Sequence, residues 1–340
     1  MGHILMTAVN AVFPIVLLIA IGYFLRYKGL INENFVKTGN KLVFTLCLPC
    51  MLFVNVYDIA DVGNVPWDII IYCTVAVTLL FLLGMAAAVA TTRHAKRRGV
   101  IWQCCFRSNF AIIGIPLAGA LGGDAAAAVS SLIATLVVPI FNIFAVIALS
   151  VFVEEGSNSK PGIKRILLDI LKNPLIIAVF IGLGFLGIRS LQIQLFGDVV
   201  ISLRHDLTFL YSVLEKLKAI TTPLALLVLG GQFQFNVVKG MFREIAVGTI
   251  LRIVIAPVLG IGAALLLEHF TGLVSCGPEA MPAMIALFGS PVAISSAVMA
   301  SQMKNDEQLA AQLVVWTSIG SIATVFLQVC ILMLAGFLVV

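Results

Sequence analysis

The residues of this sequence that are best suited to chemistry lie where apolar stretches are interrupted. Arg107-Ser108-Asn109 comes shortly before Gly114-Ile115-Pro116, and a second Gly-x-Pro break follows at Gly289-Ser290-Pro291. The N–H groups that begin a helix carry partial positive charge and bind anions, and an arginine adds a full charge. We therefore predict an anion-binding site from the following residues: Arg107, Asn109, Gly114, Ile115, Pro116, Gly289, Ser290 and Pro291.

Each break needs a physical reason, because a backbone N–H or C=O group without a partner is costly in hydrocarbon. A broken helix persists there only where protein or a water-filled cavity satisfies the freed groups. Pro116 and Pro291 are each expected to open a new half-helix, and Ser290 can cap the second one. The alternative is that both prolines are simple kinks in continuous helices.

The proline positions also indicate an internal duplication. Pro116 and Pro291 lie 175 residues apart, and Pro49 and Pro223 lie 174 residues apart. This near-constant offset predicts that the chain contains the same structural unit twice.

Composition sets the class of protein that must position these breaks. The chain is 61% hydrophobic and 11% charged, with a mean hydropathy of +1.12, whereas a soluble domain is about 25% charged. This excludes a soluble globular protein and predicts a polytopic protein of the lipid bilayer. The net charge of +5 is attributed to positively charged cytoplasmic loops, so no nucleic-acid partner is expected. The first apolar run lacks the features of a cleaved signal peptide and is expected to be a retained helix.

Ten apolar stretches are predicted to cross a hydrocarbon core of about 30 Å as helices. They cover about 4–25, 35–56, 67–90, 100–121, 125–152, 168–187, 219–231, 245–267, 281–303 and 309–338. A polar linker at 154–165 separates residues 1–153 from residues 166–340, with five helices in each half. The predicted fold class is thus an all-α polytopic membrane protein with ten transmembrane helices, of which the fourth and ninth are broken.

The distribution of lysine and arginine predicts the orientation. The loops after helices 1, 3, 5, 7 and 9 hold 14 of the 21 basic residues, and the opposite loops hold four. Those odd loops are therefore expected in the cytoplasm, with both termini extracytoplasmic and the chain in the cell inner (plasma) membrane. Because five helices per half is odd, the halves form inverted repeats, and the breaks of helices 4 and 9 can cross near the middle of the bilayer. Such crossings hold the substrate site in many secondary transporters.

The stretch from Asn109 to Pro116 resembles the Asn-x4-Gly-Ile-Pro signature of the auxin efflux carrier family, which includes the plant PIN-FORMED carriers and bacterial homologues. The likeness extends to Asn173-Pro174-Leu175, Thr222-Pro223-Leu224-Ala225 and Pro291-Val292-Ala293. The resemblance implies two crossover helices, a scaffold of helices 1, 2, 6 and 7, and an elevator-like transport domain of helices 3–5 and 8–10. It also implies that Asn109 binds substrate and that the scaffolds pair in a homodimer. The linker at 154–165 is short where plant members carry a long hydrophilic loop.

Three polar residues have alternative interpretations. Asn109 either contacts substrate or bonds a neighbouring helix, as polar residues in membrane bundles commonly do. Arg107 either pairs with an anionic substrate or extends to the cytoplasmic face. Arg252 lies at a similar depth in helix 8, and a structural role is expected for it.

The predicted function is that of a secondary carrier for small organic anions, specifically carboxylates, working by an elevator-type alternating-access mechanism. Alternatives are a sodium-coupled symporter resembling the bile acid sodium symporters and a membrane sensor of the same fold that does not transport. An enzyme is not expected, because no nucleophile and base fall at recognisable spacing. The four histidines are scattered and no Cys, His, Asp and Glu cluster has ligand spacing, so neither a metal nor a cofactor is expected.

Overall fold

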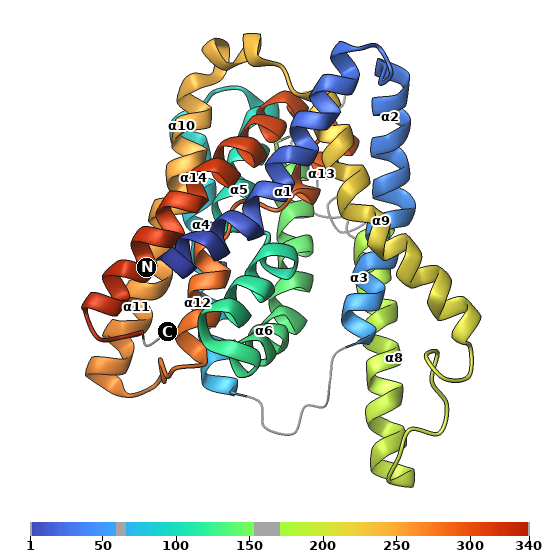
Figure 1. The fold of residues 1–340 in the computed structure, drawn as a ribbon, viewed down its shortest axis with the longest axis vertical. Helices are drawn as coiled ribbons and strands as arrows, with labels where there is room; N and C mark the ends of the chain where they lie inside the picture. Colours follow the sequence, from blue (N-terminus) through green and yellow to red (C-terminus); the bar gives the residue numbers. More distant parts are fainter. Residues whose placement is uncertain (1, 59–65, 153–170, 339–340) are drawn as a thin grey trace.

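Helices make up nearly all of the chain that the structure, a computed structural model, describes: residues 2–58, 66–152 and 171–338 (Figure 1). The prediction of an all-α fold is confirmed for these residues, and the predicted linker at 154–165 lies outside them. The α-helices are α1 (Gly2–Tyr27), α2 (Glu33–Leu42), α3 (Leu48–Tyr57), α4 (Trp67–Thr91), α5 (Ala95–Phe106), α6 (Ile115–Val151), α8 (Pro174–Phe196), α9 (Thr208–Gln232), α10 (Phe242–Ile250), α11 (Ala256–Thr271), α12 (Ala280–Gly289), α13 (Ser295–Gln302) and α14 (Glu307–Leu334). Shorter elements are the π-helices η1 (Val43–Cys47), η2 (Phe110–Gly114) and η4 (Leu251–Ile255) and the 3-10 helix η3 (Phe235–Met241).

Six helical runs in the described ranges are long and apolar enough to cross a membrane. They are Glu33–Tyr57, Trp67–Thr91, Phe110–Val151, Pro174–Phe196, Val238–Thr271 and Glu307–Leu334. The long run Phe110–Val151 contains a kink at Gly122 and Gly123, where the backbone leaves helical geometry. These runs support a polytopic membrane protein, while the arrangement of ten spans in inverted repeats stays a prediction.

Helix ends differ from the predicted ranges mainly at α9. This helix begins at Thr208, before the apolar range 219–231. A start near Tyr211 is expected from the sequence, because charged and apolar residues mix in the first turns, and this expectation is confirmed. Tyr211 lies buried there, and its hydroxyl donates to Oδ1 of Asp58 at 2.6 Å. Similarly, α8 continues past 187 to Phe196 and ends at Gly197, whose φ of 77° is favourable for glycine.

Each of the three π-helices ends two residues before a proline. The prolines are Pro49, Pro116 and Pro257, which follow η1, η2 and η4. Proline has no N–H group and its ring clashes with the carbonyl four residues earlier. The residue before each proline instead donates five residues back, as Ile115 does to the carbonyl of Phe110. The wider turn thereby lets the helix continue through the proline.

The helices separate into two groups in space (Figure 1). On one side α3 packs against α8 and α9, and α2 packs against α9. Stacked and edge-on rings of Phe53, Tyr57 and Phe185 fill the α3–α8 contact. The other group contains α4, α5, α6 and α10 to α14, with α12 at its centre, where all ten α12 residues are buried. A helix that is apolar all round is typical of a buried position or of a membrane span.

The helix α1 crosses α9 at very short range. A Cβ atom built on Gly230 would lie 2.1 Å from the carbonyl oxygen of Ile19, and one on Gly22 would lie 2.3 Å from that of Leu227. Because no side chain fits at either position, glycine is required on both helices.

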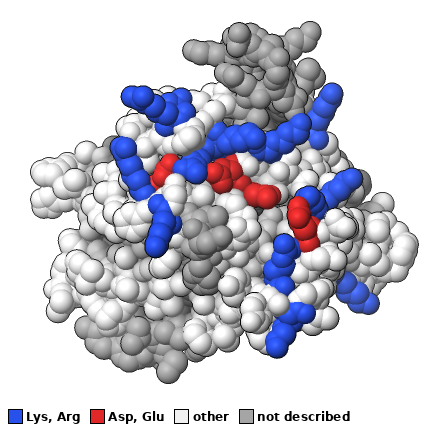
Figure 2. Space-filling view, turned by 90° about the horizontal axis from the view of Figure 1, so that it is seen from above, with Lys and Arg blue, Asp and Glu red and all other residues white. Residues whose placement is uncertain are grey.

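Basic side chains gather on one end of the bundle, the end at the top of Figure 1 (Figure 2). Within this end, Arg97 of α5 donates to Oε1 of Glu244 at 2.9 Å and to Oδ2 of Asp306 at 3.0 Å. The three residues join the starts of α5, α10 and α14. The same carboxylate of Glu244 accepts from the hydroxyl of Thr92 at 3.1 Å.

Candidate functional site

Two short segments between helices, residues 107–109 and 290–294, pair at the centre of the molecule and are called here the crossover segments. The N–H of Asn109 donates to the carbonyl of Pro291 at 2.8 Å, and the N–H of Ala293 donates to the carbonyl of Arg107 at 3.2 Å. Between them Ser108 and Val292 form an isolated antiparallel bridge. The pairing satisfies backbone groups that the two broken helices would otherwise leave unpaired. It thereby offsets the free energy that such breaks cost in a membrane.

The two helices that follow the breaks do not begin at Pro116 and Pro291 as predicted. The helix after the first break starts at Phe110, with Asn109 at its N-cap, and Pro116 lies inside the continuous run that follows. The helix after the second break starts at Ser295, and α12 before it ends at Gly289, with Ser290 in an extended conformation. The prediction that Pro116 and Pro291 open the half-helices is therefore wrong, because the π turn η2 accommodates Pro116 within a helix.

The capping role predicted for Ser290 is also wrong. Its side chain is fully buried, and its hydroxyl donates back to the carbonyl of Ala286 at 2.5 Å, within α12. A serine hydroxyl that bonds four residues back is satisfied by the preceding helix and does not cap the next one.

Arg107 lies inside the protein and does not extend to the basic end of the bundle. Only 3% of it is exposed. Its Nη2 donates to Oδ1 of Asn142 and to Oγ of Ser295, both at 2.9 Å, and its Nη1 approaches Sδ of Met299 at 2.7 Å. All three partners are neutral, and within the described residues Arg107 has no ion pair.

A small pocket of about 50 Å³ lies against the crossover segments. Arg107, Ser108 and Asn109 line it, together with Asn142 and Ser295 from α6 and α13. Nδ2 of Asn109 and Oγ of Ser108 are buried and have no hydrogen-bond partner among the residues that the structure describes. Buried polar groups are nearly always paired, so these two point to a ligand or to ordered water in the small pocket.

Three other predicted residues contribute close packing or a backbone hydrogen bond near the crossover segments. Gly114 packs on α12, where an added Cβ would lie 3.1 Å from the carbonyl oxygen of Ala286, and a Cβ on Gly289 would lie 2.8 Å from Oε1 of Gln328. Pro291 contributes its carbonyl to Asn109. Of the predicted set only Arg107 and Asn109 line the small pocket, and Ile115 lines the larger cavity beside it.

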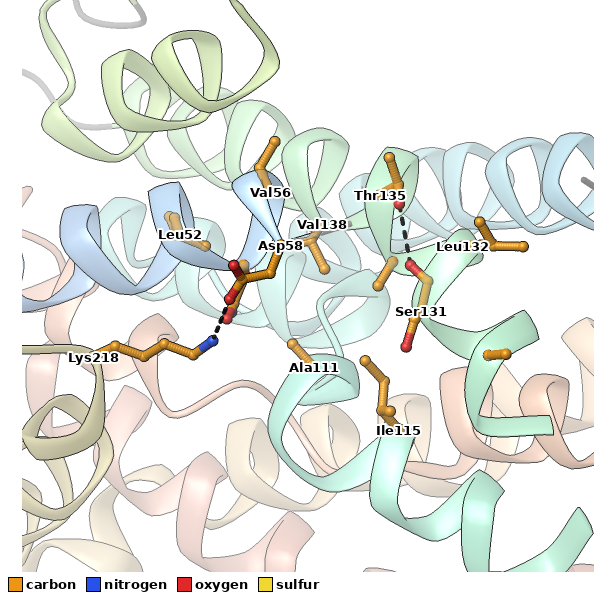
Figure 3. A pocket seen from close by; sticks show the side chains of 13 residues that line it. Leu52, Val56, Asp58, Ala111, Ile115, Ser131, Leu132, Thr135, Val138 and Lys218 are labelled. Carbon is orange, nitrogen blue, oxygen red and sulfur yellow. Dashed lines mark hydrogen bonds and ion pairs between the residues drawn. The ribbon is translucent and has the colours of Figure 1, made fainter. Parts of the chain in front are cut away.

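A large cavity of about 420 Å³ adjoins the small pocket (Figure 3). It lies between α3, α6 and α9, and most of its lining is apolar, including Leu52, Ile115 and Val138. At its margin Lys218 lies 3.7 Å from Oδ2 of Asp58. The cavity and the pocket share four lining residues: Leu52, Asn55, Ala111 and Val138.

Asn55 and Ser295 are site residues that the sequence reasoning did not single out. Asn55 lies on α3, in the helix group opposite the crossover segments, and lines both the small pocket and the large cavity. Its signal in the sequence is a lone amide between Val54 and Val56 in an apolar helix, since polar residues there tend to be functional. Ser295 begins α13 and bonds Arg107.

The contacts of Arg252 confirm the structural role expected for this residue. Arg252 is 1% exposed, and within the described part of the chain its guanidinium donates to four main-chain carbonyls, those of Cys105, Leu287, Phe288 and Ser290. It does not line either the small pocket or the large cavity.

Comparison with known proteins places the chain among transporters. A profile of the family described as membrane transport protein matches residues 7–329. An uncharacterized transporter of Methanocaldococcus jannaschii is 24% identical over 259 residues, which cover 74% of this chain and 77% of that protein. The chain belongs to the membrane transport protein family, whose members include the auxin efflux carriers.

Proposed function

We propose that this protein is a secondary carrier for small organic anions, specifically carboxylates, and that the small pocket at the crossover segments binds the carboxylate. The observation that carries this proposal is Arg107, a buried guanidinium that has only neutral partners in the described structure. Next to it the amide of Asn109 offers an unused donor.

The energetic argument favours an anion over a neutral ligand. A buried charge without a counter-charge is costly, and neutral hydrogen-bond acceptors offset only part of that cost. A bound carboxylate supplies the missing charge and accepts bonds from both Arg107 and Asn109. The N–H groups that begin η2 and α13 add partial positive charge at the same place.

The large cavity provides the route to the pocket. It reaches from the small pocket to the end of α3, where Asp58 and Lys218 lie, and this end is opposite the basic end of the bundle (Figure 1). If the basic end faces the cytoplasm, as the positive-inside rule predicts, the cavity faces outward. The described conformation then corresponds to an outward-open carrier.

Alternating access is proposed to follow from movement between the two helix groups. The proposal assigns ten spans in inverted repeats, with helices 1, 2, 6 and 7 (α1, α2 with α3, α8 and α9) as scaffold and the rest as transport domain. The large cavity lies between α3 and α9 of one group and α6 of the other, so sliding of the groups would open or close it. Near the basic end, the contact of Gln232 on α9 with Glu307 on α14 crosses the same boundary at 3.5 Å.

The test is a thermal-unfolding screen of purified protein against small mono- and dicarboxylates, indole-type acids and the neutral amides of the same acids. A ligand at about 100 times its dissociation constant stabilises a protein by about 2.7 kcal/mol. We expect at least one carboxylate to raise the unfolding temperature and its amide to leave it unchanged. Stabilisation by the amides alone, or by no acid in the screen, would contradict the proposal.

Uptake into liposomes of the acid that raises the unfolding temperature is then measured with and without a sodium gradient. This comparison separates a uniporter or exchanger from the sodium-coupled alternative. Homodimer formation through the scaffold stays a prediction, which the particle mass in nanodiscs tests.

A further inference from the structure

Arg252 brings together the ends of two broken helices. Its Nε donates to the carbonyl of Ser290 at 3.0 Å, and its Nη2 donates to the carbonyls of Leu287 and Phe288 at 3.0 and 2.7 Å. These carbonyls belong to the last turn of α12 and the residue after it. Its Nη1 donates at 3.2 Å to the carbonyl of Cys105, in the last turn of α5. One side chain thus binds the carboxyl-terminal ends of both helices that stop at the crossover.

These carbonyls matter for the sign of the electrostatic potential at the crossover. The last carbonyls of a helix have no partner within the helix and carry roughly half a negative charge together. Two such ends, those of α5 and α12, face the centre of the molecule. Together they carry about one negative charge, which the single positive charge of Arg252 offsets. What remains at the crossover are the positive beginnings of η2 and α13 and the charge of Arg107.

We infer that Arg252 is a positioning residue of the anion site, which binds the two carboxyl-terminal helix ends and makes the small pocket selective for negative charge. The inference rests on the proposed anion carrier. Arg252 acts through the main chain, because it does not line the small pocket. Its hydrogen bond to the carbonyl of Ser290 also fixes the crossover segment that contains Pro291, whose carbonyl accepts from the N–H of Asn109. Both effects follow from the same four hydrogen bonds.

The inference can be tested without knowing the substrate. Ala111 lines both the small pocket and the large cavity, so an Ala111→Cys protein can be labelled with two methanethiosulfonate reagents of similar size. One carries a sulfonate and the other a trimethylammonium group. The ratio of their labelling rates, read by mass spectrometry of the peptide with residue 111, reports the potential at the pocket. Ser275→Cys, on an exposed segment away from the crossover, is the matched control.

Because a thiolate itself attracts the cationic reagent, the ratio of anionic to cationic rates at Ala111→Cys is divided by the ratio at Ser275→Cys. We expect this normalised ratio to favour the anionic reagent in the parent, and Arg252→Gln to lower it by roughly tenfold or more. A unit charge about 10 Å away, at an effective dielectric constant of about 20, has an effect of this size on one reagent alone. The ratio at Ser275→Cys should stay constant. An unchanged ratio at Ala111→Cys in a folded Arg252→Gln protein would overturn the inference and leave the proposed function standing. A parent protein in which Ala111→Cys favours the cationic reagent more strongly than Ser275→Cys does would contradict the proposed anion site itself.

Arg252→Lys separates charge from structure and decides the matter if Arg252→Gln does not fold. Lysine keeps the positive charge but cannot donate to four carbonyls in the fixed geometry of a guanidinium. We expect a lower unfolding temperature with the labelling ratio of the parent retained. A fall of the labelling ratio in folded Arg252→Lys to the value of Arg252→Gln would show that the hydrogen-bond geometry alone matters. That result would overturn the electrostatic role of Arg252.

Discussion

The main-chain N–H of Asn109 donates to the carbonyl oxygen of Pro291 at 2.8 Å, although the two residues come from opposite halves of the sequence. The backbone of Asn109 therefore stabilises the crossover, while the Nδ2 of its side chain is buried without a partner. The backbone N–H of Asn109 thus serves the fold, and its side-chain amide stays free for the proposed binding of the carboxylate. This separation makes the side chain a good target for substitution.

Asn109→Ala should weaken carboxylate binding by about 10- to 150-fold, which corresponds to one charge-assisted hydrogen bond of about 1.5–3 kcal/mol. The unfolding temperature without ligand should change little, because the backbone bond remains. Asn109→Asp should bind more weakly still, since it places a negative charge against the anion. Calorimetric titration with the acid found in the screen measures both.

Ser130→Ala is the matched control for that experiment. Ser130 is fully buried on α6 with an unpartnered hydroxyl, yet it lines neither the small pocket nor the large cavity. Its binding constant should equal that of the parent. Equal losses in Ser130→Ala and Asn109→Ala would indicate a general effect on packing and would remove Asn109 from the site.

Arg107→Gln should lower carboxylate affinity by at least about tenfold, because it removes the charge that the anion neutralises. The folded protein loses the hydrogen bonds to Asn142 and Ser295 but also a buried charge without a counter-charge in the described region, and because these two effects oppose each other the unfolding temperature without ligand should stay near that of the parent. The two quantities are measured on the same preparation by titration and thermal unfolding. Normal affinity in this variant would mean that the guanidinium serves the α6–α13 contact only.

Arg97→Gln should have the opposite pattern. The substitution leaves Glu244 and Asp306 without their cationic partner, and their side chains are only 11% and 20% exposed. Unpaired, partly buried carboxylates should destabilise the protein by about 1–3 kcal/mol, with carboxylate affinity unchanged because Arg97 lies outside the site. Thermal unfolding and titration check this, and a stable Arg97→Gln protein would show that the ion pairs at the basic end contribute little.

The orientation and the open side of the large cavity can be tested together by labelling single cysteines in intact cells with a membrane-impermeant maleimide. Ser275→Cys and Ser131→Cys should react from outside, and Ser131→Cys, which lines the large cavity, should be protected by the bound acid. Lys96→Cys should react only after the cytoplasmic side is exposed. Reaction of Lys96→Cys and Ser275→Cys from the same side would contradict the predicted orientation.

Much of the helical architecture could be predicted because long apolar stretches and basic loops are properties of consecutive residues. The breaks near Asn109 and Ser290 were also predictable, since Gly-x-Pro sequences are unusual within apolar helices. Their exact form was not, because a π turn at Phe110–Gly114 absorbs the effect of Pro116. Local sequence does not show whether a proline breaks a helix or is accommodated.

The complete site was harder to predict, since its residues come together only in space. Asn55 reaches the small pocket from α3, and no spacing along the chain relates it to Asn109. Similarly, the partners of Arg107 lie on α6 and α13, 35 and 188 residues away. Arg107 and Arg252 are both unusual because each is a charge within an apolar stretch. Only the contacts distinguish them, since Arg252 binds the carbonyls at two helix ends and Arg107 has neutral side-chain partners.

Flux through purified protein in liposomes tests the central claim most directly. The acid that stabilises the protein is loaded outside, and its uptake is compared for the parent, Asn109→Asp and Ser130→Ala at equal amounts of folded protein. The account predicts saturable uptake by the parent and Ser130→Ala, and loss of uptake in Asn109→Asp. Parent-like uptake by Asn109→Asp would contradict it, because an anion could not then be bound at the crossover segments.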